Sequence, residues 1–219
     1  MKRDLITSAI GIVVLTLFLG VLYPLVVTGV GQLAFPGNAN GQKVYVNGKL
    51  VGSKIIGQQF QTQVVKNGKP QVDKNGNPVT TPDPKYFQSR PSATVPAYNA
   101  AGTAFSNLGP NNVTTEQAIA ANMAAYLTLE KPYDPTLTKG TIPVDAANNS
   151  ASGIDPDISP ANADIQAHRI AAVRHLQLPQ VMSLVSKYTH GRGLGFSGEP
   201  GVNVLELNLA LNRLSAGGH

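Results

Sequence analysis

The sequence feature that most constrains this chain is an uninterrupted apolar run over residues 10–30, IGIVVLTLFLGVLYPLVVTGV. No charged residue lies between Leu5 and Gln42. As a helix, the run would be about 31 Å long, close to the thickness of the hydrocarbon core of a bilayer. A segment in lipid must satisfy its own backbone hydrogen bonds, so a single crossing has to be helical. The run therefore predicts one transmembrane helix within residues 1–35.

The charges beside this helix predict its orientation. Lys2 and Arg3 precede the apolar run, and positive charge favours the cytoplasmic side. We therefore expect a cytoplasmic N-terminus, a single pass through the cell membrane, and an exterior domain over residues 36–219. Two alternatives fit less well. A cleaved signal peptide has a shorter apolar region, about 7–15 residues, and a core helix of a soluble protein has a polar side, which this run lacks.

A second pattern within the helix predicts a packing surface. Thr16, Gly20, Pro24 and Thr28 recur every four residues and so share one side of the helix. Small residues on one side allow another transmembrane helix to approach closely. Pro24 removes one helical hydrogen bond and is expected to kink the helix. Because Gly and Pro are common in transmembrane helices generally, the same pattern is compatible with a helix that has no partner.

The composition limits what the exterior domain can do. The chain has 219 residues and a formal net charge of +5, and it contains neither Trp nor Cys. About 180 residues remain after the helix, enough for one domain with a hydrophobic core. Few aromatic side chains are available to stack on bases, so we expect no nucleic-acid binding. The lack of Cys excludes disulfides, thiolate nucleophiles and cysteine zinc sites.

Asn-Gly pairs mark the turns of the predicted β structure. Asn47-Gly48, Asn67-Gly68 and Asn75-Gly76 lie between strand-like segments, and this pair favours the two-residue turns of hairpins. The last two pairs lie within residues 62–85, which we interpret as an inserted, exposed β-ribbon whose Lys and Pro residues protect its edges. Ser53 to Phe60 is predicted to be a core strand.

Capping signals predict the helices of the exterior domain. Thr114 and Gln117 form a capping-box pattern, and Ser159 followed by Pro160 is typical of an N-cap and a first helical residue. The C-terminal stretch alternates Leu as a strand would, but its Leu, Glu, Ala and Asn residues are weak strand formers, so we expect a helix there. The fold class is therefore α+β, with a small antiparallel sheet and packed helices. The predicted segments are helices at Thr114–Glu130, Ala161–Leu176, from Pro179, and within Val202–Leu214, and a short strand at Ile142–Asp145.

No catalytic or metal-binding pattern is supported by the sequence. His168 and His175 would lie about 10 Å apart along a helix, too far for one zinc ion. Asp155 and Asp157 lack the alternating oxygen ligands and the closing Glu of a calcium loop, so we interpret them as turn carboxylates. The chain has no G-x-S-x-G elbow and no Walker phosphate loop. We therefore expect a protein that is not an enzyme, with no metal or cofactor of its own.

Motifs spread over nearly the whole chain resemble those of one protein family. The most specific stretch is residues 150–160, SASGIDPDISP, followed by Gln166, Arg169 and Arg174. The chain is similar to KdpC, the small accessory subunit of the Kdp potassium-importing P-type ATPase. It departs from the family where Asp157 replaces the usual His, and where the 62–85 ribbon resembles an insertion. Further residues that carry the resemblance are Arg90, Pro91, Ser92, Ser106, Asn107, Ser152, Gly153, Asp155, Pro156, Ser159, Pro160, Asn203 and Asn208.

The resemblance implies a non-catalytic subunit of a high-affinity, ATP-driven potassium uptake complex. Its partners would be a channel-like potassium-binding subunit, a P-type ATPase subunit and a very small membrane subunit. KdpC-like subunits are described as aiding assembly and as raising the ATP affinity of the ATPase subunit. This catalytic-chaperone role is linked to a Gln-x-x-Arg region, here Gln166 and Arg169.

The ATP-linked role conflicts with the predicted orientation, because an exterior domain cannot meet cytoplasmic ATP. The alternative for Gln166 and Arg169 is a structural hydrogen-bond pair with the loop of residues 148–160. A different class of function also fits the layout. A membrane-anchored exterior binding module unrelated to transport would share the anchor and the domain, but it would not need the motif of residues 150–160. An exterior hydrolase is a third alternative, against which the missing catalytic motifs argue.

Overall fold

The computed structural model describes residues 1–216. The chain forms two compact units, residues 1–53 and residues 54–219.

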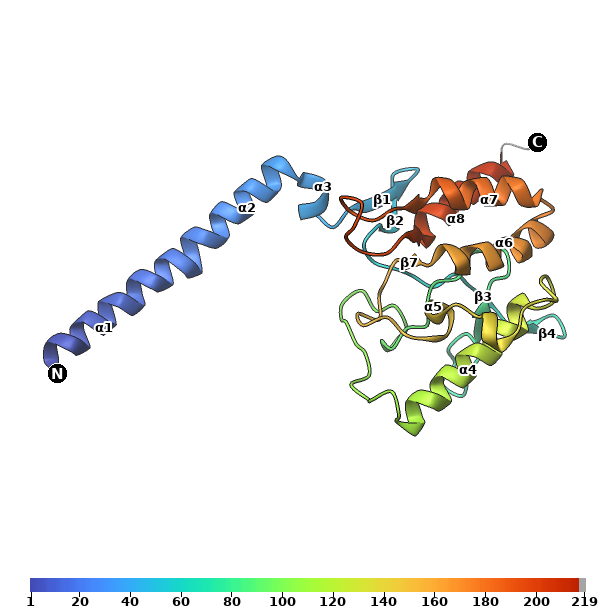
Figure 1. Cartoon of the computed structure of the whole chain (residues 1–219), viewed down its shortest axis with the longest axis horizontal. Helices are drawn as coiled ribbons and strands as arrows, with labels where there is room; N and C mark the ends of the chain where they lie inside the picture. The colour runs from blue at the N-terminus through green and yellow to red at the C-terminus, as the bar shows by residue number, and fades with distance from the viewer. Residues whose placement is uncertain (217–219) are drawn as a thin grey trace. The chain divides into compact units, whose positions relative to one another are not determined.

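One long helix dominates the first unit (Figure 1). It spans Lys2–Ala34, 33 residues, and its apolar window has no residue buried in the protein. Among residues 1–216 it is the one helix long and apolar enough to cross a membrane, so the helix predicted at the N-terminus is confirmed. It consists of α1 (Lys2–Leu15), the π-helical segment η1 (Thr16–Leu22) and α2 (Tyr23–Ala34), and the short helix α3 (Pro36–Ala39) follows.

The long helix widens just before Pro24. At the end of η1, the N–H of Tyr23 donates to the carbonyl of Phe18, five residues earlier. Pro24 has no N–H, and its ring presses against the preceding turn of an α-helix. A wider π turn relieves this contact, and such turns are one recognised cause of helix bending. The structure thus has a π-helical segment directly before Pro24, and the predicted kink itself stays a prediction.

A hairpin completes the first unit. β1 (Lys43–Val46) pairs antiparallel with β2 (Lys49–Ser53). Asn47 and Gly48 between them have φ values of 51° and 77°. Both therefore occupy the left-handed region that a two-residue hairpin turn requires, and the prediction from this Asn-Gly pair is confirmed.

The second unit carries the predicted exposed ribbon. Its four short strands pair antiparallel, outermost with outermost and inner with inner. Asn67 and Gly68 connect the inner strands with φ values of 52° and 73°, which confirms the second hairpin turn. The outer pair is β3 (Gln61–Gln63) with β6 (Thr80–Pro82), and the inner pair is β4 (Val65–Lys66) with β5 (Lys69–Pro70).

The third Asn-Gly pair does not make a two-residue turn. The Asp73 carboxylate accepts hydrogen bonds from the backbone N–H groups of Asn75 at 2.8 Å and Asn77 at 2.9 Å. This wider turn is closed by a single β-bridge between Val72 and Pro78. Sequence reasoning missed Asp73, whose short side chain organises the turn together with its backbone hydrogen bonds to Gly76 and Asn77.

The core strand predicted over Ser53–Phe60 is wrong. β2 ends at Ser53, and residues 54–60 form a turn and an irregular segment with a single bridge. Gly57 explains the difference, because its N–H donates to the carbonyl of Ile154 at 2.8 Å. A Cβ at Gly57 would lie 2.4 Å from the carbonyl oxygen of Asp155. The segment therefore lies against a loop of the same unit.

The helices of the second unit follow the predictions closely. Ser159 caps α6 by accepting a hydrogen bond from Asn162 N at 3.1 Å, and Pro160 is its first residue, as predicted. The capping box predicted at Thr114 is wrong, since the side chain of Asn112 accepts from Thr114 N and caps α4. The helix predicted at the C-terminus is confirmed. The helices are α4 (Val113–Glu130), α5 (Val144–Ala147), α6 (Pro160–Arg174), α7 (Leu178–Lys187) and α8 (Val204–Ala216), with a 3₁₀ turn, η2, at Lys139–Thr141.

The strand predicted over Ile142–Asp145 is also wrong. The helix α5 begins at Val144, directly after Pro143. Its last two residues, Ala146 and Ala147, are buried. Ala is the strongest helix former, so local preference and packing agree on a helix here.

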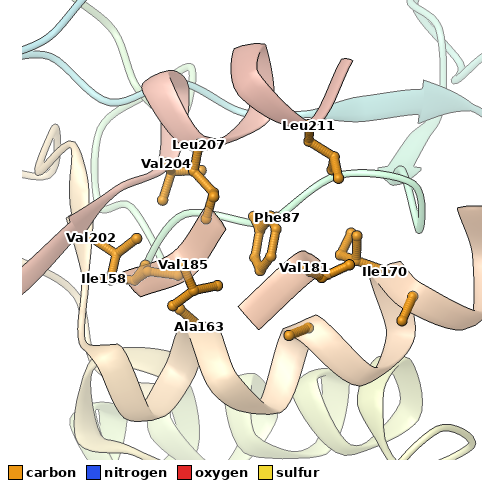
Figure 2. Close-up of a cluster of buried hydrophobic side chains, with 12 residues drawn as sticks. Phe87, Ile158, Ala163, Ile170, Val181, Val185, Val202, Val204, Leu207 and Leu211 are labelled. Carbon is orange, nitrogen blue, oxygen red and sulfur yellow. The ribbon is translucent and has the colours of Figure 1, made fainter. Parts of the chain in front are cut away.

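Three helices and a small sheet enclose the core of the second unit. The sheet has strand order β7-β9-β8 and is antiparallel throughout. Figure 2 shows Phe87, which comes from an irregular segment, at the centre of apolar side chains from α6, α7, α8 and the sheet. The α+β class is thus confirmed, with several small antiparallel sheets instead of one. The sheet strands are β7 (Asp157–Ile158), β8 (Thr189–His190) and β9 (Gly201–Asn203).

Candidate functional site

Three of the residues that the sequence singles out surround one irregular segment, residues 84–88. Asn208 on α8 bonds to both backbone groups of Phe87, with N–H to Oδ1 at 2.9 Å and Nδ2 to the carbonyl at 3.0 Å. Gln166 on α6 bonds to both backbone groups of Gln88 in the same way. Its Oε1 accepts from the N–H at 2.7 Å, and its Nε2 donates to the carbonyl at 3.1 Å. Each amide side chain therefore replaces the neighbouring strand that this segment lacks.

Arg169 completes this arrangement, which we call the segment clamp and define as Gln166, Arg169 and Asn208. One guanidinium nitrogen of Arg169 donates to the carbonyls of Pro84 and Tyr86, the latter at 3.0 Å. Its Nη2 donates to Gln166 Oε1 at 3.0 Å. The segment clamp thus holds residues 84–88 between two helices and places Phe87 in the core.

The charge of Arg169 is balanced inside the protein by Glu130. Arg169 Nε lies 3.0 Å from both carboxylate oxygens of Glu130, and the two residues are 0 % and 1 % exposed. Burial raises the pKa of the Glu130 carboxyl, and the Arg169 guanidinium opposes that rise. Glu130 is the last residue of α4, where the helix dipole also disfavours a negative charge. The guanidinium of Arg169 is therefore what stabilises the buried Glu130 carboxylate.

This geometry corrects the partner predicted for Gln166 and Arg169. Their hydrogen bonds are structural, but they go to residues 84–88 and to Glu130 instead of the loop of residues 148–160. Gln166 is 1 % exposed, and each nitrogen of the Arg169 guanidinium has a protein acceptor. Neither side chain presents a free donor to a nucleotide at the surface.

A second cluster joins two motif-bearing loops. Arg90 Nη1 lies 2.9 Å from Asp155 Oδ2, and Ser92 Oγ donates to the carbonyl of Gly153 at 2.6 Å. Gly153 has φ +71°, and a Cβ there would lie 2.5 Å from the carbonyl oxygen of Ala104. Only glycine combines that conformation with that contact. The motif residues of this cluster therefore hold the loop that contains Arg90 and Ser92 against the loop that contains Gly153 and Asp155.

The remaining polar motif residues organise helix starts. The carboxylate of Asp145 accepts hydrogen bonds from Ser159 Oγ at 2.7 Å and Asn162 Nδ2 at 2.9 Å. Asn203 Oδ1 accepts from Glu206 N at 3.1 Å at the start of α8, and its Nδ2 donates to the carbonyl of Lys54 at 2.8 Å.

Asp157 and Pro156 lie between these two helix starts. Burial raises the pKa of Asp157, and His190, whose Nε2 lies 3.6 Å from Asp157 Oδ2, opposes that rise. The carbonyl of Pro156 accepts from Val204 N at 3.1 Å. This pairing continues the contact between β7 and β9 to the beginning of α8.

Ser106, Asn107 and Pro91 lie apart from these networks. Ser106 lines a hollow of about 540 Å³ between the loop of residues 105–110, α4 and residues 147–151. The residues that line it include hydroxyl and amide side chains but no titratable one. Asn107 is exposed in the same loop, and Pro91 lines a smaller hollow of about 200 Å³ beside Arg90.

Two observations describe the polar chemistry of this part of the chain. Within residues 1–216 no group of three His, Cys, Asp or Glu side chains could hold a metal ion. General acid–base catalysis requires a titratable side chain within hydrogen-bond reach of the substrate, and the larger hollow offers none.

The predicted packing side of the long helix is open. A Cβ at Gly20 would meet Thr16 Cγ2 at 3.8 Å, so these two residues adjoin on one side. Thr16, Gly20, Pro24 and Thr28 are all exposed in this chain. The side remains available for a partner helix.

Comparison with known proteins identifies the family. Residues 5–213 match the family model described as KdpC: K+-transporting ATPase, c chain. The chain belongs to the KdpC family. This confirms the resemblance drawn from the motifs, and it explains why those motifs run through nearly the whole KdpC sequence.

Individual KdpC relatives match along nearly their full length. A protein of Methylococcus capsulatus is 46 % identical over 204 residues, covering 93 % of this chain and 94 % of the relative. One of Koribacter versatilis is 41 % identical over 212 residues, with 97 % and 95 % covered. One of Mycobacterium tuberculosis is 42 % identical over 214 residues, with 98 % and 100 % covered. Each is named potassium-transporting ATPase KdpC subunit.

Sequence reasoning missed two residues of this site. Glu130 was assigned only as the end of a helix, yet it is the buried partner of Arg169. Gln88, whose backbone is held by Gln166, also folds its own side chain back onto the carbonyls of Phe60, Asp83 and Tyr86. A carboxylate at a helix C-terminus was the available signal for Glu130, because such a charge is disfavoured unless a cation pairs with it.

Proposed function

We propose that this chain is a non-catalytic accessory subunit of a potassium-transporting P-type ATPase complex. The observation that carries the proposal is the family match over residues 5–213. The helix Lys2–Ala34 supports it, since its length and composition suit a membrane anchor. In this proposal the N-terminus is cytoplasmic, the helix crosses the cell membrane once, and the rest of the chain lies outside.

The proposed role is assembly and stabilisation of the complex. The partners are a channel-like potassium-binding subunit, a P-type ATPase subunit and a very small membrane subunit. Gln166 and Arg169 act inside the domain by holding residues 84–88, because both are buried and bonded to the protein. Any effect on ATP affinity would therefore pass through the assembled ATPase subunit, without a nucleotide bound to this chain.

The packing side of the helix gives the proposal a direct test. Gly20→Leu places a branched side chain where the proposed partner helix would approach. Gly11→Leu is the matched control, because Gly11 lies in the same helix, away from the side shared by Thr16 and Gly20, with no atom within 4 Å of its Cβ position. We expect the tagged wild-type chain and Gly11→Leu to copurify with the other subunits, and Gly20→Leu to lose them.

Two outcomes would count against the proposal at different levels. If Gly20→Leu copurifies as the wild type does, the helix side that contains Gly20 is not the packing surface, while the assembly role is unaffected. A wild-type chain that purifies alone from membranes containing an intact pump would overturn the accessory role and favour a separate exterior binding module.

A further inference from the structure

Residues 192–199 of the second unit form an exposed turn that is braced by several hydrogen bonds. Gly193 and Ser197 exchange two backbone hydrogen bonds, at 2.7 Å and 2.8 Å. Arg192 ties the base of the turn together, with Nε to the carbonyl of Gly198 at 3.0 Å and Nη2 to Glu199 Oε2 at 2.7 Å. The three residues at the tip, 194–196, are therefore held in a defined conformation.

The tip combines two features that are unfavourable for an isolated domain. Leu194 is 90 % exposed and Phe196 is 78 % exposed. Two large apolar side chains, separated by one glycine in the sequence, therefore face water. Leu194 also has φ +53°, a left-handed conformation that is disfavoured for a residue with a Cβ. Residues held in disfavoured backbone conformations of this kind cluster at functional positions.

We propose that Leu194 and Phe196 insert into the interfacial region of a lipid bilayer and give the domain a second membrane contact. This inference rests on the proposed function, in which Lys2–Ala34 holds the chain in a bilayer. In this proposal the covalent link to that helix raises the effective concentration of the tip at the lipid surface. A weak apolar contact is then sufficient for binding. Each of the two side chains is expected to raise the inserted population about tenfold.

The charges around the tip suit a lipid surface. No carboxylate lies between His190 and Gly198 in the sequence. Glu199 is the nearest acidic residue along the chain, and it is paired with Arg192. Phosphate groups therefore meet no unpaired negative charge at the turn, and Arg192 can lie at headgroup level while the apolar side chains enter the lipid.

The absence of Trp from the chain provides a selective probe. We would place one Trp at the tip, Phe196→Trp, in the full chain reconstituted alone into phosphatidylcholine vesicles. Trp keeps an apolar aromatic ring at this position and suits the membrane interface. The expected result is a blue-shifted emission that is quenched when the vesicles contain lipids brominated on the acyl chain. A separate variant, Leu19→Trp within the long helix, reports anchoring independently.

Two further variants sharpen the test. Leu194→Asn in the Phe196→Trp background removes the apolar side chain but accepts the left-handed backbone. It should lower the inserted population about tenfold without loss of the fold. Val72→Asn changes an exposed apolar residue on the ribbon and should leave quenching unchanged.

The outcomes separate this inference from the proposed function. Quenching at position 19 but none at position 196 would overturn the lipid contact and leave the anchor standing. No quenching at either position would overturn both. A blue shift at position 196 only when the other subunits are present, without quenching by brominated lipid, would also overturn it and assign the tip to a protein pocket.

Discussion

Removing the guanidinium of Arg169 tests the segment clamp most severely. Arg169→Met keeps a long side chain on α6 but deletes the hydrogen bonds to residues 84–88 and the ion pair with Glu130. Glu130, 1 % exposed, would keep a carboxyl with no cation beside it. The carbonyls of Pro84 and Tyr86 would lose their guanidinium donor.

The expected cost follows from these losses. Removing one partner of a buried ion pair costs about 3–5 kcal/mol, because the other charge is left without compensation. Each buried carbonyl left unsatisfied adds about 1–3 kcal/mol. These contributions overlap, so we take about 4 kcal/mol as the lower end. Since a domain is stable by about 5–15 kcal/mol in total, Arg169→Met should remove a large fraction of the second unit's stability.

The change in unfolding free energy can be measured by unfolding the full chain with urea in detergent. The protease susceptibility of the second unit reports how much of it is unfolded at each urea concentration. Arg213→Met is the matched control, because Arg213 is exposed on α8, and it should shift the unfolding free energy by less than about 0.5 kcal/mol. The double variant Arg169→Met/Glu130→Leu removes both charges, so its cost should fall below the sum of the single costs by about 2 kcal/mol or more. An Arg169→Met chain within about 1 kcal/mol of wild type, or strictly additive single costs, would refute the reasoning.

Three further predictions address the clamp, a loop contact and a turn. Asn208→Ala leaves two buried backbone groups without partners and should lower the unfolding free energy by about 2–4 kcal/mol; a loss under about 0.5 kcal/mol in the same urea assay would mean that the amide is dispensable. Gly153→Ala should cost about 1–3 kcal/mol more than Gly68→Ala, because both glycines have positive φ but only at Gly153 would the Cβ meet a backbone carbonyl, that of Ala104; equal thermal shifts would contradict the close contact. The hydrogen bonds from Asn77 lower the pKa of Asp73, so its contribution to the turn is present above the unfolded pKa and is lost as pH falls through the folded pKa. Amide NMR shifts of the turn should report this loss in acid, and Asp73→Asn, which keeps the acceptor oxygen, should abolish it; a turn that titrates equally in both chains would contradict the assignment.

Local chemistry determined the parts of the fold that could be predicted. The apolar run of residues 10–30 requires a helix in lipid whatever surrounds it. Asn47-Gly48 and Asn67-Gly68 encode their turns through two positive φ angles, a property of the residues themselves. Ser159 followed by Pro160 acts in the same way at the start of α6. These signals depend on neighbours in the sequence.

Features that depend on distant partners could not be predicted in this way. Ser53–Phe60 has a strand-like pattern, but Gly57 is bonded to Ile154, almost a hundred residues further on. For Gln166 and Arg169, the structural alternative has the right kind of interaction and the wrong partner, because nothing near them in the sequence points to residues 84–88. A side chain that pairs with a backbone segment leaves no periodicity to detect. Tertiary contact alone decides such cases.

The central claim is that this chain serves potassium transport as a membrane-anchored subunit. Growth of a deletion strain at micromolar potassium, with and without the chain restored from a plasmid, tests it most directly. We predict that the strain without the chain fails to grow until potassium is added, and that the restored chain recovers growth. Normal growth at micromolar potassium without the chain, while the other subunits carry out uptake, would contradict the claim.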